Sequence, residues 1–147
     1  QLLMRYYRDP EKTAAAFTGG WFHSGDLGVV DEQGYITIVD RKKDMINSGG
    51  ENVASREVEE AIYRHSAVDE VAVVGLPDPK WVERVCAAIV LKPGVAATSE
   101  DILRVCEDMA PFKRPKQVAF VESLPKNPSG KILKRELRQF LADATNI

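Results

Sequence analysis

Apolar residues in the second half of the chain recur with the periods of helices and strands. From position 55 onwards they fall at i, i+3, i+4 and i+7 of a predicted helix that Ser55 caps, a face made of Val58, Ala61, Ile62 and His65. The runs 71–76 and 85–91 are apolar throughout and are stopped by turns that contain proline, which is typical of buried strands. A helix followed by two strands is therefore predicted here.

The pattern continues to the C-terminus. Thr98 and Asp101 have the spacing of a capping box, which predicts a helix that ends at Pro111. Its core face would be Ile102, Cys106 and Met109. A strand is predicted over 117–121 and a last helix over 133–141, with an inward face made of Leu133, Leu137, Phe140 and Leu141. This order of elements predicts an α/β (α+β) domain with a short mixed sheet and packed helices.

The first 40 residues have a different pattern. Asp9 and Pro10 are types favoured at the start of a helix, which we expect to run to about position 17. The segments 27–30 and 35–39 predict a β-hairpin around the turn 31–34. Its two faces would carry Ile36 and Ile38 on one side and Tyr35, Thr37 and Val39 on the other.

A run of five charged residues at 40–44 separates this hairpin from the rest of the chain. Such a run is unsuited to a core and marks a boundary between domains. The segment 45–53 that follows is predicted as a strand ending in a Gly-Gly loop.

Composition narrows the choice of partner. A chain of 147 residues with 44% hydrophobic and 29% charged residues fits one domain, or one domain and a piece of another. The net charge of -2 gives no reason to expect nucleic acid as a partner, and no apolar run approaches the ~20 residues that cross a bilayer. Cys86 and Cys106 match no metal spacing, so we expect free thiols and a cytoplasmic protein. Because the chain starts at Gln1 without an initiator methionine, we expect a fragment of a longer protein.

Four short motifs occur in a fixed order. They are Gly-Trp-Phe-His-Ser-Gly-Asp at 20–26, Asp-Arg-Lys-Lys-Asp at 40–44 with Ser-Gly-Gly-Glu-Asn at 48–52, Phe-Lys-Arg-Pro-Lys at 112–116, and Leu-Pro-Lys at 124–126 with Ser-Gly-Lys at 129–131. Each motif alone has an ordinary explanation as a capped turn, a β-bulge or a solvated basic loop. Together they resemble the adenylate-forming superfamily, and the chain is most similar to its fatty-acyl-CoA synthetase branch.

The resemblance implies a two-step ligase. A carboxylic acid, here a fatty acid, attacks the α-phosphate of ATP with Mg²⁺ to give an acyl-adenylate and pyrophosphate, and the thiol of coenzyme A then attacks the adenylate and releases AMP. It also implies that residues 1–40 are the tail of a large N-terminal domain whose remainder is missing, that 41–44 form a hinge, and that 45–147 are the whole small C-terminal domain. We expect no metal ligands in this chain and no substrate bound tightly by it alone.

Four residues receive roles in the first step from the resemblance. Asp26 would accept hydrogen bonds from the two ribose hydroxyls, since a carboxylate suits a vicinal diol. Arg41 would lie near the ribose and phosphates, and Lys43 would be the hinge residue about which the small domain rotates. Lys131 would reach the α-phosphate and the acid, where an ammonium offsets developing negative charge.

A second set of residues is assigned to coenzyme A in the same way. Gly49 and Gly50 would let the pantetheine arm pass close to the backbone, and Trp81 would line its tunnel, although a rim or core aromatic is an equal alternative. The nucleotide phosphates of coenzyme A would meet Lys113, Arg114 and Lys116.

Two other functions remain open. The parent protein could load its acyl group onto the phosphopantetheine of a carrier protein, although the basic cluster at 113–116 favours coenzyme A. The isolated chain could also be a non-catalytic module, and we expect this of the fragment by itself. The unpaired edges of the hairpin 27–39 would allow a homodimer.

Overall fold

The computed structural model describes residues 3–145, which form two compact units that meet along the chain between Lys43 and Asp44. We call them the N-terminal unit and the C-terminal unit. Among residues 3–43 none is fully buried, so the apolar core of the described chain belongs to the C-terminal unit.

The N-terminal unit contains a short helix and a β-hairpin. Helix α1 (Pro10–Ala16) starts as predicted, because the Asp9 side chain accepts a hydrogen bond from the Lys12 amide at 2.9 Å. A 3₁₀ turn, η1 (Thr18–Gly20), follows. Strands β1 (Asp26–Val30) and β2 (Ile36–Arg41) pair antiparallel with a bulge after the first two residues of β1, which confirms the hairpin.

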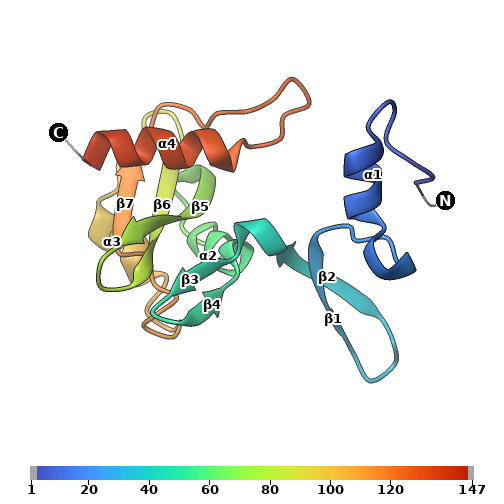
Figure 1. Cartoon of the computed structure of the whole chain (residues 1–147). Helices are drawn as coiled ribbons and strands as arrows, with labels where there is room; N and C mark the ends of the chain where they lie inside the picture. The colour runs from blue at the N-terminus through green and yellow to red at the C-terminus, as the bar shows by residue number, and fades with distance from the viewer. Residues whose placement is uncertain (1–2, 146–147) are drawn as a thin grey trace. The chain divides into compact units, whose positions relative to one another are not determined.

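The C-terminal unit is built on a five-stranded sheet (Figure 1). Its strands are β3 (Ile46–Ser48), β4 (Glu51–Val53), β5 (Val68–Asp78), β6 (Val82–Leu91) and β7 (Gln117–Phe120). Strand β6 is central: it runs antiparallel to β5 and β3 and parallel to β7, so the sheet is mixed, as predicted.

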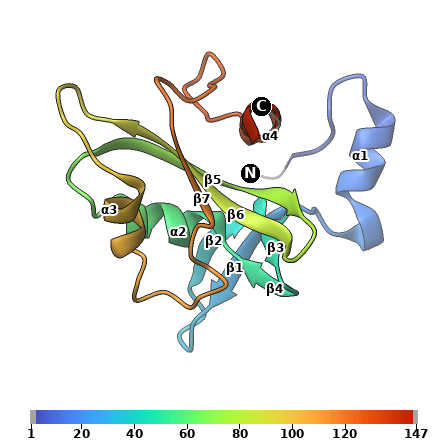
Figure 2. The same ribbon diagram turned by 90° about the vertical axis from the view of Figure 1, so that its left-hand side faces the viewer.

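Helices cover both faces of this sheet (Figure 2). Helices α2 (Ser55–Ile62) and α3 (Ser99–Arg104) pack on one face, and α4 (Lys134–Thr145) packs on the other. Alternate residues of β5 point to opposite faces of the sheet. Val71 and Val73 belong to the core beneath α2, and Ala72 and Val74 belong to the core beneath α4. The α+β architecture is therefore confirmed.

The outer edge of β5 is covered by side chains of the chain's own α2 region. Strand β5 pairs with β6 on one side, and on the other the Val71 amide donates to the Tyr63 hydroxyl at 3.4 Å and the Val73 amide to Glu59 Oε1 at 2.9 Å. The position of Pro77 inside β5 is compatible with such an edge strand, because proline has no amide to donate.

Several predicted details are wrong at the ends of elements. The segment 45–53 is a hairpin of two short strands rather than one strand. Ala54, not Ser55, is the N-cap of α2, and Ser55 is a buried first helical residue. His65 lies beyond the end of α2 and is half-buried.

The remaining differences concern α3 and α4. The capping box of Thr98 and Asp101 is present, but α3 ends at Arg104 and the chain reaches Cys106 in a turn. Phe140, predicted to face inward, has 56% of its surface exposed, because the inward positions of α4 are Leu137 and Leu141. In the part of the chain that the structure describes, no helix has the length and hydrophobicity to cross a membrane.

Candidate functional site

Lys131 lies on a loop that leads into α4 (Figure 1). The loop closes like a small hairpin, in which Lys126 bridges Ile132 and the Asn127 amide donates to the Lys131 carbonyl at 2.9 Å. Successive side chains of an extended segment point to opposite sides. Because Ile132 packs against the core beneath α4, Lys131 points to solvent and is exposed.

The side chain of Asn127 organises the backbone of this loop. Its Oδ1 accepts hydrogen bonds from the Ser129 amide (3.1 Å), the Ser129 hydroxyl (2.8 Å) and the Lys131 amide (2.9 Å). Gly130 has φ 81°, a left-handed conformation that glycine adopts without strain. The main chain of Lys131 is thus fixed, while its ammonium makes no hydrogen bond or ion pair with any residue that the structure describes.

Asp26 and Arg41 lie opposite each other where β1 and β2 pair. Arg41 Nε is 3.4 Å from Asp26 Oδ1, and the two side chains remain 46% and 30% exposed, respectively. A concave surface of the N-terminal unit beside them is lined by Ser24, Gly25, Arg41, Lys42 and Lys43. A carboxylate and a guanidinium that are both still accessible can bind a diol and an anion on such a surface.

Lys43 occupies the middle of a short 3₁₀ turn, η2 (Lys42–Asp44), between two attached neighbours. On one side the Lys42 amide donates to the Gly25 carbonyl at 2.8 Å, within the N-terminal unit. On the other, Asp44 Oδ1 lies 3.5 Å from Nη2 of Arg138 on α4, within the C-terminal unit. Lys43 itself is exposed, so it is the residue at which the chain passes from one attachment to the other.

Gly49 and Gly50 form the turn of the β3–β4 hairpin, and Gly49 contacts Trp81. Both have positive φ (66° and 92°), as a two-residue hairpin turn of this type requires. The Gly49 amide donates to the Trp81 carbonyl at 2.6 Å, and a Cβ at Gly49 would lie 3.1 Å from the indole ring. This close approach of backbone to indole explains why glycine stands at position 49.

Two ammonium groups lie against the same indole. Lys80 Nζ and Lys116 Nζ are 5.2 Å and 5.1 Å from the centre of the Trp81 ring, which is within the range of a cation–π interaction. Partial burial, together with repulsion from Arg114 and Lys80, lowers the pKa of Lys116 below its ordinary value. We call Gly49, Gly50, Lys80, Trp81 and Lys116 the Trp81 corner.

The other two predicted coenzyme A contacts already have partners within the chain. Lys113 Nζ is 2.7 Å and 2.8 Å from the two carboxylate oxygens of Glu57. Arg114 donates from Nε to the Met109 carbonyl (2.8 Å) and from Nη2 to the Glu107 carbonyl (2.7 Å), which fixes the turns after α3. Lys116 also has a partner, because its Nζ donates to the Pro111 carbonyl at 2.5 Å. Of the three basic residues assigned to coenzyme A, however, it alone reaches the Trp81 corner.

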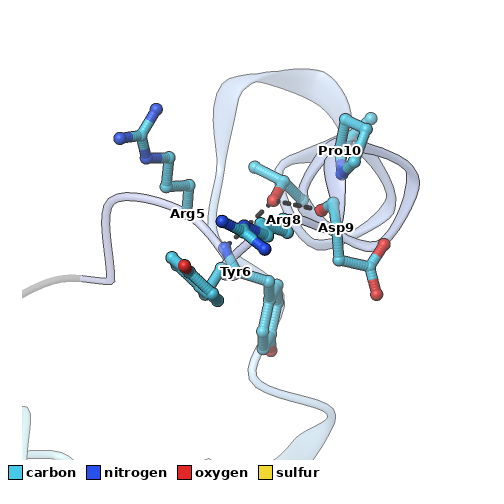
Figure 3. Close-up of a pocket in the computed structure, with 8 residues that line it drawn as sticks. Arg5, Tyr6, Arg8, Asp9 and Pro10 are labelled. Carbon is cyan, nitrogen blue, oxygen red and sulfur yellow. Dashed lines mark hydrogen bonds between the residues drawn. The ribbon is translucent and has the colours of Figure 1, made fainter.

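A further concavity lies at the start of the N-terminal unit and contains none of the predicted site residues (Figure 3). Inside it the Tyr6 amide donates to Thr13 Oγ1 at 3.0 Å, and Thr13 Oγ1 donates to the Asp9 carbonyl at 2.7 Å. These two bonds join Tyr6 to α1, so the Tyr6 amide and the Thr13 hydroxyl serve the local structure. The lining residues are Arg5, Tyr6, Tyr7, Arg8, Asp9, Pro10, Thr13 and Ala14.

Comparison with known protein families identifies the C-terminal unit. The sequence model of the AMP-binding enzyme C-terminal domain matches residues 57–131, about half of the chain and most of the sheet. The chain belongs to this family. The resemblance to adenylate-forming enzymes is thereby confirmed.

Relatives of this AMP-binding enzyme domain include CoA ligases from bacteria and plants. The chain is 49% identical over 139 residues to a long-chain-fatty-acid–CoA ligase of Mycobacterium tuberculosis, covering 94% of this chain and 27% of the ligase. It is 48% identical over 141 residues to a peroxisomal butyrate–CoA ligase of Arabidopsis thaliana, covering 93% and 25%. The chain therefore spans about a quarter of the length of these relatives.

Solved structures show the same fold as this AMP-binding enzyme domain. The ATP-bound MatB of Rhodopseudomonas palustris matches with a TM-score of 0.87 at 39% identity, covering 96% of this chain and 28% of that protein. An o-succinylbenzoate CoA synthetase of Bacillus subtilis in complex with its acyl-adenylate intermediate matches with a TM-score of 0.85 at 34% identity, covering 92% and 28%.

Three features of the domain were missed from the sequence. The sequence motifs do not include Asn127, although Asn before Pro-Ser-Gly is a residue type that caps turns through its side chain. Lys80 follows a proline-rich turn next to Trp81 and carried no signal of its own. The pairing of Asp44 with Arg138 joins residues far apart in sequence, and no local pattern predicts it.

Proposed function

We propose that this chain is the C-terminal part of an AMP-forming acyl-CoA synthetase. The full-length protein would join a carboxylic acid to ATP, giving acyl-adenylate and pyrophosphate, and would then transfer the acyl group to the thiol of coenzyme A with release of AMP. The observation that carries this proposal is the exposed ammonium of Lys131 on a loop whose backbone is fixed, in a domain of the AMP-binding enzyme family.

Lys131 would act in the first step. An ammonium close to the α-phosphate stabilises the negative charge that builds up as the carboxylate attacks and pyrophosphate leaves. A lysine with an unengaged ammonium needs no internal ion pair to be broken before it binds the phosphate. The ordered turn beneath it also limits the entropy lost when it does.

The Trp81 corner would act in the second step. A Cβ at Gly50 would meet nothing within 4 Å, so this glycine would leave room for a narrow thiol arm beside the backbone, and Trp81, which packs on Gly49, would offer an apolar wall. Lys80 and Lys116 repel each other and would gain from binding a phosphate of coenzyme A. Lys113 and Arg114 are less suited to this role, because Glu57 and two carbonyls hold them away from the Trp81 ring. Lys116 also donates to a carbonyl, that of Pro111, but its ammonium lies over the ring.

The separation of these two groups supports a rotation between the steps. The Lys131 loop is tied to β5 near its start, where Lys126 pairs with Glu70, and Trp81 follows the end of the same strand. Eight residues of strand between Glu70 and Asp78 span roughly 25 Å. Groups that are attached at different points along one rigid strand would use different orientations of the domain to reach one adenylate.

Lys43 is proposed as the hinge for this rotation, as part of the linker 41–44. Its neighbours are attached on either side, so a change in its φ and ψ would rotate the C-terminal unit without breaking either attachment. On this proposal Asp26 and Arg41 bind the ribose and phosphates from the N-terminal unit, and Mg²⁺ arrives with ATP rather than on ligands of this chain.

The names of the relatives suggest the substrate, and the two buried cysteines suggest the compartment. Names of the relatives point to fatty acids as the acid, and the remainder of the large domain would be the partner of this chain. Burial raises the pKa of the Cys86 thiol to about 11, so the thiol stays protonated and unreactive. Two buried free cysteines suit a reducing compartment such as the cytoplasm.

The test is an assay of the full-length protein with fatty acids of several lengths, ATP and Mg²⁺, with and without coenzyme A. Without coenzyme A we expect acid-dependent exchange of pyrophosphate into ATP, and with it equal amounts of AMP and acyl-CoA. Release of ADP and phosphate, or ATP use that requires coenzyme A from the start, would contradict the proposal. Acyl transfer to a carrier protein but not to free coenzyme A would replace the second step with carrier loading.

A further inference from the structure

The first turn of α4 carries a charge that is unfavourable for the helix itself. Lys134 and Arg135 open this 12-residue helix, and cations near a helix N-terminus oppose the helix dipole, which Glu136 in the same turn offsets only in part. Lys134 comes three residues after Lys131, at the point where the loop becomes helix. An anion from elsewhere in the fold that pairs with Lys134 would offset this unfavourable charge.

That partner is a half-buried carboxylate on another layer of the domain. Lys134 Nζ lies 2.8 Å from Glu59 Oε1 and 2.6 Å from the Ser55 hydroxyl, both on α2. The side chains of Lys134 and Glu59 are 17% and 18% exposed, and Ser55 is fully buried. Reduced contact with water strengthens this pair relative to the more exposed ion pairs of the domain.

Glu59 also binds the backbone at the outer edge of the sheet. The same Oε1 that binds Lys134 accepts the amide of Val73, on the outer edge of β5. Because α2 and α4 lie on opposite faces of the sheet (Figure 2), one carboxylate oxygen joins both helices to the strand between them. The start of α4 is therefore attached to α2 and, through Glu59, to β5.

The other end of the loop is held in the same way. Lys126 Nζ lies 2.6 Å from Glu70 Oε2 on β5, and the Leu133 amide donates to the Pro125 carbonyl at 2.8 Å. The loop thus has two ion-paired lysines at its ends and one unengaged lysine between them.

We propose that Lys134, through Glu59, is a positioning residue for Lys131. This inference rests on the proposed function, in which Lys131 must reach the α-phosphate within hydrogen-bonding distance. A displacement of about 1 Å costs up to about 100-fold in rate when it affects a reacting group. Lys134 touches no substrate; it fixes the point from which the Lys131 loop extends.

The test uses the full-length protein with Lys134→Met, Lys134→Arg and Glu59→Gln. The matched control is Arg104→Met, which removes an exposed ion pair with Asp101 on α3. Pyrophosphate exchange measures the first step, and transfer from added acyl-adenylate to coenzyme A measures the second. Deuterium exchange of the peptide covering 126–133 measures the order of the loop.

For Lys134→Met we expect a first step slower by about 10-fold to 100-fold, mainly in kcat, an unchanged second step, and faster deuterium exchange in 126–133. Lys134→Arg should recover most of the rate, and Glu59→Gln should have an intermediate effect, since its amide oxygen still accepts the Val73 amide. Arg104→Met should match the wild type in all three measurements.

Other outcomes separate this inference from the proposed function. Equal losses in both steps would mean that Lys134 only stabilises the fold, and an unchanged first step would also overturn the inference. If the wild type activates no acid, the proposed function fails, and the positioning role is then judged by deuterium exchange. Unchanged exchange of 126–133 in Lys134→Met would overturn that role. Faster exchange confined to 126–133 would support it.

Discussion

Two basic loops of the C-terminal unit use their cations in opposite ways. In the loop 112–116, Lys113 is paired with Glu57 and Arg114 with two carbonyls, so both cations hold the fold together. In the segment 126–134, the two end lysines are paired, whereas Lys131 between them has no partner among residues 3–145. The difference shows why Lys131 is a stronger candidate for a site residue than Lys113 or Arg114.

The largest expected effect comes from removing the unengaged cation. Lys131→Ala in the full-length protein should slow pyrophosphate exchange by about 100-fold to 1,000-fold, the range found when a transition-state donor is removed. Acyl transfer from added adenylate should persist. The midpoint of thermal unfolding should not change, because the side chain is exposed and unpaired among the described residues.

Lys131→Arg serves as the control for charge, and we expect it to keep part of the activity. A clear loss of thermal stability in Lys131→Ala would make this lysine structural and remove the contrast between the two loops.

The next effect should be on stability and come from the other loop. Arg114→Met removes two charge-assisted hydrogen bonds and should lower the free energy of unfolding by about 2 kcal/mol. Lys113→Met is the matched control: its pair with Glu57 is more exposed and should contribute less than about 1 kcal/mol. Urea denaturation of the two variants measures the difference.

Equal losses for Arg114→Met and Lys113→Met would indicate that the turns after α3 do not depend on the guanidinium. A loss of coenzyme A affinity without a loss of stability would restore Arg114 to the binding site that the sequence suggested.

Arg138 extends the comparison to a paired cation outside both loops. Its bond to Asp44 attaches the segment after Lys43 to α4, so Arg138→Met should let the linker bend at more than one residue. We expect overall turnover to fall about fivefold while each half-reaction, measured alone, changes less than twofold. If one half-reaction measured alone slowed as much as the overall turnover, this would argue against a role of Arg138 in rotation.

The smallest effect concerns the Trp81 corner and depends on pH. The pKa of Lys116 is lowered by partial burial and by Arg114 and Lys80, so the neutral amine appears at a lower pH than in an isolated lysine. A lysine whose pKa is lowered by folding destabilises the folded state while it is charged, and this cost disappears as pH rises toward the unfolded value.

Lys80→Met removes one source of repulsion, so the pKa of Lys116 should rise and its acetylation by a limiting reagent at pH 8 should slow roughly twofold. Peptide mass spectrometry measures this change. Faster acetylation would mean that Lys80 shields Lys116 rather than repelling it.

Local signals in the sequence predicted the elements well and the partners poorly. The cap of α1, the capping box of α3 and the two long strands depend on residues within a few positions of each other. Glu57 and Lys113 are 56 positions apart, and Ser55 and Lys134 are 79 apart, so only the folded sheet brings them together. For this reason Lys113 and Arg114 looked as available from the sequence as Lys131.

The covered edge of β5 has a consequence for a domain that moves. An open strand edge is a template for another strand, and a domain that swings away from its neighbour during each catalytic cycle would expose it repeatedly. Here Tyr63 and Glu59 occupy the outward amides of Val71 and Val73, so a second chain finds no donors at those positions. On the proposed rotation, Glu59 and Tyr63 would thus protect the C-terminal unit against aggregation through this edge.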